Sequence, residues 1–334
     1  SSDYPLRDVY KRQVMYLRNV RIGKISLNTL RNIRSIVDLN LDVFRFDTIE
    51  RYALYWIKYS LRSLTINKMD FKTLNTLLIE LNELPYLKKL TLTNCNLDGL
   101  FNPDWLMGFK NLEILTMEAN TLNSFGMKKF RRFPYLNYLA IKGNNFNSIK
   151  TILDSLENVF TPNLIALDLS GNQIDSLDLQ DLETFSSLTT LYLSQNNLKT
   201  LPKDYSKMLK SLSSWSLSGN KLSDVNELDE VGEIATFYSL SVENNLYSKM
   251  PNMNKLSNLN RLVMSNQNGK LRELRNFEFD LNNMNMIDLR DNNITSIASR
   301  SFCSHYSNTS IANIKLDLDS FKLINKCQFK QIKE

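Results

Sequence analysis

The sequence contains few side chains that can carry out chemistry. Its one histidine, His305, lies in the polar stretch SHYSNTS, so a metal site with several histidines is excluded and one base is left for a Ser or Cys triad. No Walker loop, G-x-G-x-x-G, C-x-x-C or H-E-x-x-H motif occurs. A lone histidine among polar residues is typical of an exposed loop. We therefore expect no catalytic residue, no metal site, no cofactor and no enzyme activity.

A carboxylate pair is the other group with catalytic potential. Asp288 and Asp317 approach each other if the segments around them form adjacent strands, which the repeats described below predict. Arg290 and Lys315 lie close to them in the sequence. This arrangement indicates ordinary surface charge balance.

Composition places the chain among folded proteins. The 334 residues include 55 Leu and 41 Asn, with 43% hydrophobic and 23% charged residues, which excludes disordered and collagen-like classes. The length would suit two or three ordinary domains, but no Pro/Gly/Ser-rich linker interrupts the chain. These features together favour a repeat array.

The formal charge of +6 is concentrated at the N-terminal end. Residues 1–100 hold 16 basic and 10 acidic residues, and residues 101–334 hold 25 of each. The basic residues from Arg18 to Lys89 are interspersed with Asp38 and Asp42, whereas a nucleic-acid-binding protein concentrates Lys and Arg on one face. We expect a solvated basic end and no nucleic acid. No apolar run reaches the ~20 residues of a membrane span, so no membrane-spanning helix is expected in this fragment.

The first residues do not read as a natural start. Residues 1–13, SSDYPLRDVYKRQ, lack an initial Met, and the part from residue 6 onward resembles a translated adapter. We expect residues 1–13 to be a non-native scar and the native N-terminus, with any signal peptide, to be absent. Residues 14–334 are predicted to form one domain.

A leucine pattern recurs along that domain. The segment 188–201, LTTLYLSQNNLKTL, fits L-x-x-L-x-L-x-x-N-x-L, with Asn196 at the ninth position. Thirteen copies start at residues 17, 36, 61, 87, 112, 136, 164, 188, 212, 237, 259, 284 and 311. The twelve intervals average about 24.5 residues, within the leucine-rich repeat period of roughly 20 to 29. Thirteen copies in phase make a repeat architecture the specific interpretation.

The chain thus resembles animal-type, arthropod-like extracellular leucine-rich repeat proteins over residues 14–326. The resemblance implies an α/β solenoid, the leucine-rich repeat horseshoe, with a parallel sheet on the concave face and short helical or extended segments on the convex side. In x-L-x-L-x two side chains point inward and three outward. One convex segment, TILDSLENVFTPN at 151–163, has apolar residues at helical spacing and is expected to be a helix.

The ninth position of each repeat forms a predicted ladder. An Asn there can donate to and accept from backbone groups in the turn after the strand. The ladder comprises Cys95, Asn120, Asn144, Asn172, Asn196, Asn220, Asn245 and Asn292, with Gln267 in the repeat between the last two. Apolar residues occupy it in the first three repeats, so residues 14–86 are expected to be irregular, 87–300 regular, and 301–334 a C-terminal cap with the last repeat.

Cysteines and glycosylation signals bear on the compartment. Cys303 and Cys327 fall outside the predicted strands of consecutive repeats, and the resemblance to extracellular arrays with cysteine-stapled ends implies a disulfide between them; the family's usual C-x-C pair is missing. Asn293 and Asn308 begin N-x-S/T triplets. Together they favour a secreted or cell-surface glycoprotein. Two unpaired thiols in a cytosolic protein are the alternative.

The outward positions of the strands then become the candidate binding face. Small hydroxyls occupy much of its C-terminal half, and bulkier residues precede them: Glu118, Tyr138, Lys142, Asp168 and Tyr192. Exposed aromatic residues flanked by charges are typical interface anchors, so these five are the predicted partner site, with the two tyrosines roughly 10 Å apart if two strand spacings separate them.

The function predicted from these features is protein binding. We expect a non-enzymatic module that binds a protein ligand or co-receptor through the concave face, outside the cell, as in innate recognition, adhesion or a secreted complex. An intracellular scaffold or regulatory subunit and a non-catalytic subunit of a secreted enzyme remain the alternatives.

Overall fold

The computed structural model describes residues 13–31, 35–81, 84–98, 101, 106, 108–124, 133–156, 163–183, 186–274, 284–297 and 313–315. The chain divides into two compact units. Unit 1 contains residues 1–141 and 154–160, and unit 2 contains residues 142–153 and 161–334. The proposed scar at 1–13 lies outside the described residues except for Gln13.

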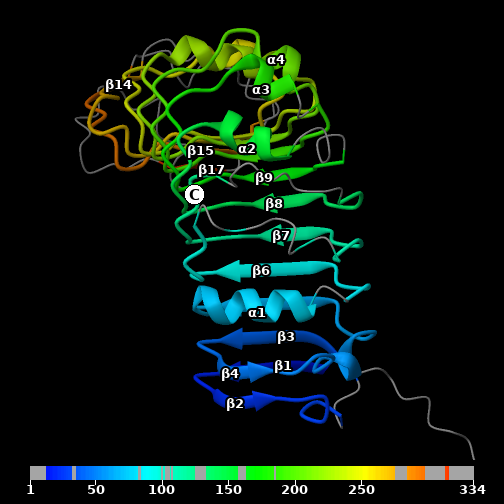
Figure 1. The fold of residues 1–334 in the computed structure, drawn as a ribbon. Helices are drawn as coiled ribbons and strands as arrows, with labels where there is room; N and C mark the ends of the chain where they lie inside the picture. Colours follow the sequence, from blue (N-terminus) through cyan, green and yellow to red (C-terminus); the bar gives the residue numbers. More distant parts are fainter. Residues whose placement is uncertain are drawn as a thin grey trace, which may run out of the picture. The chain divides into compact units, whose positions relative to one another are not determined.

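Unit 1 is built on a parallel sheet whose strands follow one another in chain order (Figure 1). Its described strands are β1 (Gln13–Arg18), β3 (Ile36–Asp42), β5 (Ser63–Asn67), β6 (Lys89–Thr93), β7 (Ile114–Thr116) and β8 (Tyr138–Ala140). The alternation of the repeat is visible in β5, where Leu64 and Ile66 are fully buried between half-exposed neighbours. A pair of parallel strands, β2 (Arg21–Ile25) and β4 (Arg45–Ile49), forms a second small sheet.

The first repeat has a different register from the one that the leucine pattern predicts. We expected Leu17 to open this repeat, but Leu17 pairs with Leu41, the sixth residue of the next repeat. The first repeat therefore contributes β1 to the main sheet. Its ladder position, next to Phe44 of the second repeat, is occupied by Val20. Ile25 instead pairs with Ile49 in the small sheet. The prediction was wrong because the apolar residues of β2 imitate the spacing of the main strand.

Two helical segments of unit 1 lie between its strands. The 3-10 helix η1 (Tyr55–Ile57) precedes β5, and α1 (Phe71–Leu81) follows it. Helix α1 begins where the Asp70 carboxylate accepts hydrogen bonds from the backbone N–H and hydroxyl of Thr73, at 3.0 and 2.8 Å. Its buried face consists of Leu74, Leu77, Leu78 and Leu81, at helical spacing.

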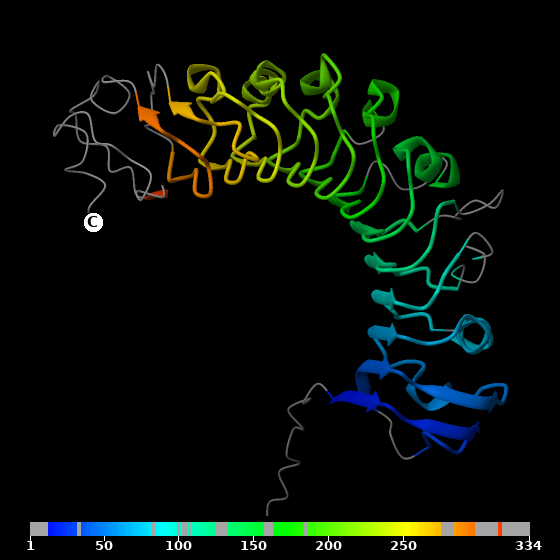
Figure 2. The ribbon, with the colours of Figure 1, turned by 90° about the vertical axis from the view of Figure 1, so that its left-hand side faces the viewer.

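Unit 2 repeats the same scheme with shorter strands. Its described main-sheet strands are β9 (Ala166–Asp168), β10 (Thr190–Tyr192), β11 (Ser214–Ser216), β12 (Ser239–Ser241), β13 (Arg261–Val263), β15 (Met286–Asp288) and β17 (Asn313–Lys315), all parallel. A separate pair joins β14 (Glu273–Leu274) to β16 (Ser296–Ile297). In Figure 2 the main strands of this unit line its inner side and the helical segments line its outer side.

The helical segments between these strands are short. They are α3 (Leu179–Glu183), α4 (Tyr205–Met208), η3 (Val225–Glu233) and η4 (Met253–Lys255). The helix predicted over 151–163 is present as α2 (Ile149–Leu156), and residues 157–162 lie outside the described part. The leucine-rich repeat solenoid predicted from the sequence is confirmed as the fold.

Amide side chains at the ladder positions connect consecutive repeats. Asn196 accepts a hydrogen bond from the backbone N–H of Ile174 in the preceding repeat, at 3.0 Å. Its Nδ2 donates to the carbonyls of Leu169 and Leu193, both at 3.0 Å. Asn220 and Asn245 make the corresponding bonds one and two repeats further on. The ladder satisfies backbone groups that would be costly to bury unpaired.

The ladder continues through both substituted positions. Gln267 is fully buried, accepts a hydrogen bond from the N–H of Tyr247 at 3.2 Å and donates one to the carbonyl of Val242 at 2.9 Å, so the ladder hydrogen bonds are retained in this repeat. In unit 1, Cys95 is fully buried and its thiol donates to the carbonyl of Thr93 at 3.3 Å. Asn120 follows it and accepts from the Cys95 N–H at 2.8 Å.

Candidate binding surface

The strands of unit 2 present a continuous outward face. In β9 to β13 and β15 the middle residue of each strand is at most 1% exposed, so strand alternation directs the first and third residues to the opposite face. These residues are exposed or half-buried except Val263 and Asp288, which are 8% and 3% exposed. The sheet register aligns them in two rows. The first row is Ala166, Thr190, Ser214, Ser239, Arg261 and Met286; the second is Asp168, Tyr192, Ser216, Ser241, Val263 and Asp288. We call these residues, with the residue two places after each strand, the strand face.

The centre of the strand face is a floor of serine hydroxyls. Ser194 and Ser216 lie 2.6 Å apart through their Oγ atoms, and Ser218 and Ser241 lie 2.8 Å apart. Each pair shares one hydrogen bond across neighbouring strands, so one hydroxyl of each pair has its donor satisfied within the chain. Because the serine side chains are small, the floor leaves room for a bulky partner group.

Aromatic and acidic groups border one end of this floor. Tyr192 is 37% exposed and pairs in register with Asp168 on the neighbouring strand. The Asp168 carboxylate accepts a hydrogen bond from the backbone N–H of Ser170 at 2.9 Å, which orients it. Lys142 belongs to the same unit and is exposed. These three predicted site residues are therefore held by one unit.

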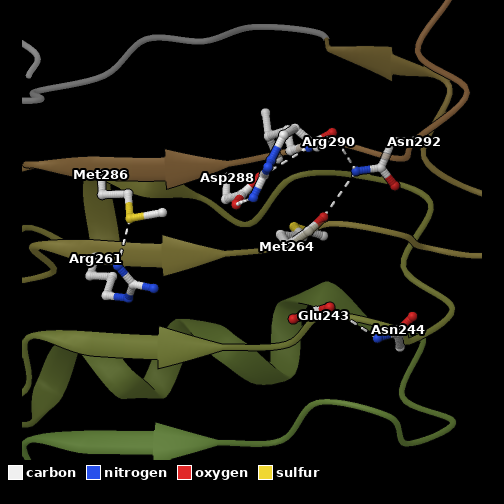
Figure 3. Close-up of polar contacts among 9 residues, drawn as sticks. Glu243, Asn244, Arg261, Met264, Met286, Asp288, Arg290 and Asn292 are labelled. Atoms are coloured by element: carbon white, nitrogen blue, oxygen red, sulfur yellow. Dashed lines mark hydrogen bonds and ion pairs between the residues drawn. The ribbon is translucent and has the colours of Figure 1, made fainter. Parts of the chain in front are cut away.

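Charged groups border the other end, where Figure 3 shows Asp288 and Arg290 facing each other. Arg290 donates from Nε to Oδ1 at 2.9 Å and from Nη2 to Oδ2 at 2.7 Å. The Asp288 side chain is 5% exposed and that of Arg290 is 50% exposed. Burial acts to raise the Asp288 pKa, but the hydrogen bonds from Arg290 and the charges of Arg290 and Lys315 outweigh it and hold the pKa below its usual value.

The ion pair between Asp288 and Arg290 bears on the possibility that Asp288 and Asp317 form a carboxylate pair. Asp288 is engaged by Arg290, as the sequence indicated for surface charge balance, and Asp317 lies outside the described residues. A buried carboxylate that already accepts two guanidinium bonds is held in its ionised form and is poorly suited to transfer protons. Asp288 therefore anchors Arg290.

Two more residues at this end were not identified from the sequence. Arg261 and Met286 are paired in register, and the Arg261 Nη1 lies 2.6 Å from the Met286 sulfur (Figure 3). Glu243 follows the end of β12, and its carboxylate accepts a hydrogen bond from the Asn244 side chain at 3.2 Å. Strand alternation in the sequence could have identified Arg261 and Met286, since both occupy outward positions in the first row. Their mutual contact could not be read from spacing.

The five residues predicted as a partner site are divided between the units. Glu118 and Tyr138 belong to unit 1, where both are half-buried and Tyr138 pairs in register with Ile114. Lys142, Asp168 and Tyr192 belong to unit 2. The predicted grouping of all five, and the separation of roughly 10 Å between the tyrosines given by strand spacing, stays a prediction. The structure brings together Asp168 and Tyr192.

Several other predicted positions lie outside the described residues, namely Cys303, His305, Asn308, Asp317 and Cys327. Asn293 is described and is exposed in the segment that leads to β16. Within the described ranges, no three His, Cys, Asp or Glu side chains are grouped as a metal site would need. No helix in that same part of the chain has the length and apolar character to cross a membrane.

Comparisons with known proteins bear on the fold. Residues 85–146 match the family model described as leucine rich repeat. The chain is 30% identical over 162 residues to tubulin-specific chaperone E of Dictyostelium discoideum, which covers 48% of this chain and 26% of that protein. It is 26% identical over 241 residues to mouse lumican, covering 72% of this chain and 60% of lumican. The chain thus spans between a quarter and three fifths of these relatives.

The solved structures extend the likeness to almost the whole chain. An internalin from Listeria monocytogenes matches with a TM-score of 0.51 and 16% identity, covering 91% of this chain and 88% of the internalin. At this identity the match concerns the fold alone. Together with the parallel strands, the buried leucines and the amide ladder, it shows that this chain has the leucine-rich repeat fold.

Proposed function

We propose that this chain is a non-enzymatic module that binds a protein partner through the strand face of unit 2. The observation that carries the proposal is the arrangement of that face: a floor of paired serine hydroxyls with Tyr192 and Asp168 at one end and Arg261 and Arg290 at the other. A leucine-rich repeat fold is in general an interaction module for proteins, and this supports the proposal.

Binding favours side chains that lose water and conformational freedom at low free-energy cost. Tyr192 offers a large ring at low conformational cost, and aromatic residues and Arg are enriched at interface hot spots. Arg290 is oriented by two bonds to the buried Asp288, so part of its side-chain entropy is already lost before a partner binds. The half of Arg290 that remains exposed is thus a preorganised donor for a partner's carboxylate or carbonyl.

The predicted site of Glu118, Tyr138, Lys142, Asp168 and Tyr192 is retained as part of the proposal. Asp168 and Tyr192 supply the acidic and aromatic end of the strand face. Glu118 and Tyr138, in unit 1, are proposed to take part in binding the same partner. Replacing both tyrosines with Ala is expected to weaken binding at least about tenfold, roughly 1.4 kcal/mol.

We further propose an extracellular setting, secreted or at a cell surface. The exposed Asn293 in an N-x-T triplet supports it, because a glycan needs an accessible acceptor. The proposed Cys303–Cys327 disulfide and glycosylation at Asn308 belong to the same proposal. Lumican is an extracellular relative.

An intracellular scaffold is the second candidate, and one observation favours it. The 30% identity to tubulin-specific chaperone E, an intracellular protein, extends over 162 residues. Endoglycosidase treatment of the protein isolated from its source distinguishes the two settings. A mass loss at Asn293 or Asn308 supports the extracellular proposal, and an unglycosylated protein with reduced Cys303 and Cys327 contradicts it.

Binding is tested by capture of partners from the source tissue, followed by affinity measurement with the purified partner. We expect Tyr192→Ala combined with Arg261→Glu to lose the partner, because the two changes remove an anchor at each end of the strand face. Lys203→Glu is the matched control, since Lys203 is exposed beside α4 on the helical side of the same unit. Unchanged affinity of the double variant, with loss in the control, would refute the strand-face proposal.

A further inference from the structure

A second surface with binding character lies in unit 1, away from its main strands. A cavity of about 310 Å³ opens between the segment 51–58, which includes η1, and the end of α1 with Leu84. Arg51, Tyr52, Tyr55 and Lys58 line one side, and Ile79 and Glu80 line the other. We call this the aromatic-basic pocket. Its volume is at the low end for ligand sites, so it admits one or two side chains.

Large apolar side chains are exposed around this pocket. Tyr52, Tyr55 and Ile79 are 47, 49 and 58% exposed. The nearby Tyr59 and Tyr86 are 60 and 47% exposed, and their ring centroids lie 6.2 Å apart. Five of the twelve exposed large hydrophobic residues in the described chain therefore fall between residues 52 and 86. Clustered exposure of this kind marks an interaction surface, whereas single exposed residues do not.

Cations cover the tyrosine rings at the rim. The Arg51 guanidinium lies 5.0 Å from the centre of the Tyr52 ring, and the Lys58 Nζ lies 5.7 Å from that of Tyr59. Lys58 also lines the pocket, so it connects the cavity to the pair of rings beyond it.

Arg62 contacts both Tyr59 and Tyr86. Its guanidinium lies 4.8 Å from the centre of the Tyr86 ring, and its Nη1 donates to the carbonyl of Tyr59 at 2.8 Å. These contacts place three positive charges along one aromatic surface.

The acidic residue of the pocket has a structural role. Glu80 accepts a hydrogen bond from the backbone N–H of Tyr52 at 3.1 Å. Tyr52 has φ +65°, a left-handed conformation that bulky residues rarely adopt, and this bond helps to hold it. Among the described residues that line the pocket, the positive charges of Arg51 and Lys58 outnumber the one negative charge of Glu80, and Arg62 adds a positive charge at the rim. The site is therefore complementary to an acidic ligand.

We propose that the aromatic-basic pocket binds an acidic segment of a protein partner. One apolar side chain of the segment enters the cavity between Tyr55 and Ile79, and flanking carboxylates pair with Arg51 and Lys58. A single-stranded nucleic acid is the competing ligand, since it also combines negative charge with stacking groups. The rings favour a peptide, because Arg and Lys already lie over faces of Tyr52, Tyr59 and Tyr86 that bases would need for stacking.

This inference is independent of the strand face. It concerns the other unit and different residues, so either proposal can fail without the other. It also gives the basic excess of residues 1–100 a specific role.

Direct binding of labelled peptides to the full chain tests the proposal. The probes are fluorescein-labelled 12-residue peptides with four Glu residues around a central Leu, Phe or Trp, read by fluorescence anisotropy. The comparison peptides replace every Glu with Gln, or the central residue with Gly. We expect the best acidic peptide to bind at least tenfold more tightly than its Gln and Gly counterparts.

The variants assign that binding to the pocket. Arg51→Glu with Lys58→Glu is expected to weaken it at least tenfold, and Tyr55→Ala at least fivefold. Lys110→Glu with Tyr135→Ala is the matched control in unit 1, because both residues are exposed and neither lines the pocket; its affinity should stay within twofold. Circular dichroism confirms that each variant is folded.

Three results would overturn the proposal. These are the absence of binding by every acidic peptide, equal binding by the Gln or Gly peptides, and an unchanged affinity in the folded Arg51→Glu, Lys58→Glu variant. A labelled twelve-residue oligothymidylate that binds more tightly than the peptides, and is lost in the same variant, would assign the pocket to nucleic acid.

Discussion

Gln267 donates the same hydrogen bond to Val242 that Asn245 donates to Leu217 one repeat earlier, at 2.9 and 3.0 Å. Each carbonyl acceptor is the sixth residue of the preceding repeat. A side chain one methylene longer thus performs the same role, because the backbone around position 267 accommodates it while keeping the amide group at the ladder.

The ladder makes a prediction about two variants at that position. Gln267→Ala should lower the free energy of unfolding by at least about 1 to 3 kcal/mol, because it leaves the Tyr247 N–H and the Val242 carbonyl buried without their partner. Gln267→Asn should cost clearly less, since it keeps an amide. Urea unfolding followed by circular dichroism measures both. Equal losses would mean that side-chain volume, and not hydrogen bonding, matters at this position.

The core of unit 2 gives a second prediction. Leu193 is fully buried, and Leu193→Ala should cost about 2 to 5 kcal/mol of stability. The neighbouring repeats should loosen with it, because each repeat is stabilised mainly by its neighbours. Thermal unfolding and amide hydrogen exchange report these effects. Leu27→Ala serves as the control, since Leu27 is 39% exposed and its truncation should change stability by no more than about 0.5 kcal/mol.

A third prediction concerns pH and Cys95. Burial raises the pKa of this thiol from 9.0 to about 11, against the opposing effect of backbone hydrogen bonds. The unfolded chain therefore releases the proton first, and the stabilising effect of the protonated thiol is complete below pH 9 and is lost as the pH rises toward 11. Wild-type protein should lose about 2 to 3 kcal/mol more than Cys95→Ala over this range.

Denaturant unfolding at several pH values between 8 and 11 measures that difference. Tyrosines and lysines also titrate in this range, but they are present in both proteins and their effects cancel in the comparison. Parallel stability curves for wild type and variant would show that Cys95 ionises with equal ease in both states.

A fourth prediction is the disulfide between Cys303 and Cys327, which closes a loop of about 24 residues and should contribute roughly 3 kcal/mol. Intact-mass analysis after alkylation, with and without reductant, is the measurement. Without reductant, protein secreted from eukaryotic cells should take up at most one alkyl group, at Cys95, and only after denaturation. Two alkylated thiols at residues 303 and 327 in the unreduced protein would rule the disulfide out.

Periodicity was sufficient to predict most of the fold. Each repeat from Ile36 onward has its strand where the leucine pattern places it, because its buried apolar residues recur at a constant spacing. The first repeat failed because the apolar residues of β2 have the same spacing as those of a main strand. Local spacing alone does not report which of two sheets a strand joins.

The binding surfaces were less accessible to sequence reasoning. The outward position of Tyr192 follows from strand alternation, but the contact between Arg261 and Met286 depends on the register of two strands and on rotamers. The aromatic-basic pocket is harder still to predict, since Tyr52 and Tyr55 lie between β4 and β5, outside the leucine pattern of the second repeat. The pocket forms only because α1 brings Ile79 and Glu80 beside them.

The direction of the ladder has a consequence for synthesis. The N–H of Ile174 is satisfied by Asn196, that of Leu198 by Asn220 and that of Leu222 by Asn245, so each repeat depends on the repeat that is translated after it. On the ribosome, the most recently emerged repeat always lacks the amide that completes its turn. The hydrogen bonds of a nascent repeat are therefore completed only after the following repeat has emerged.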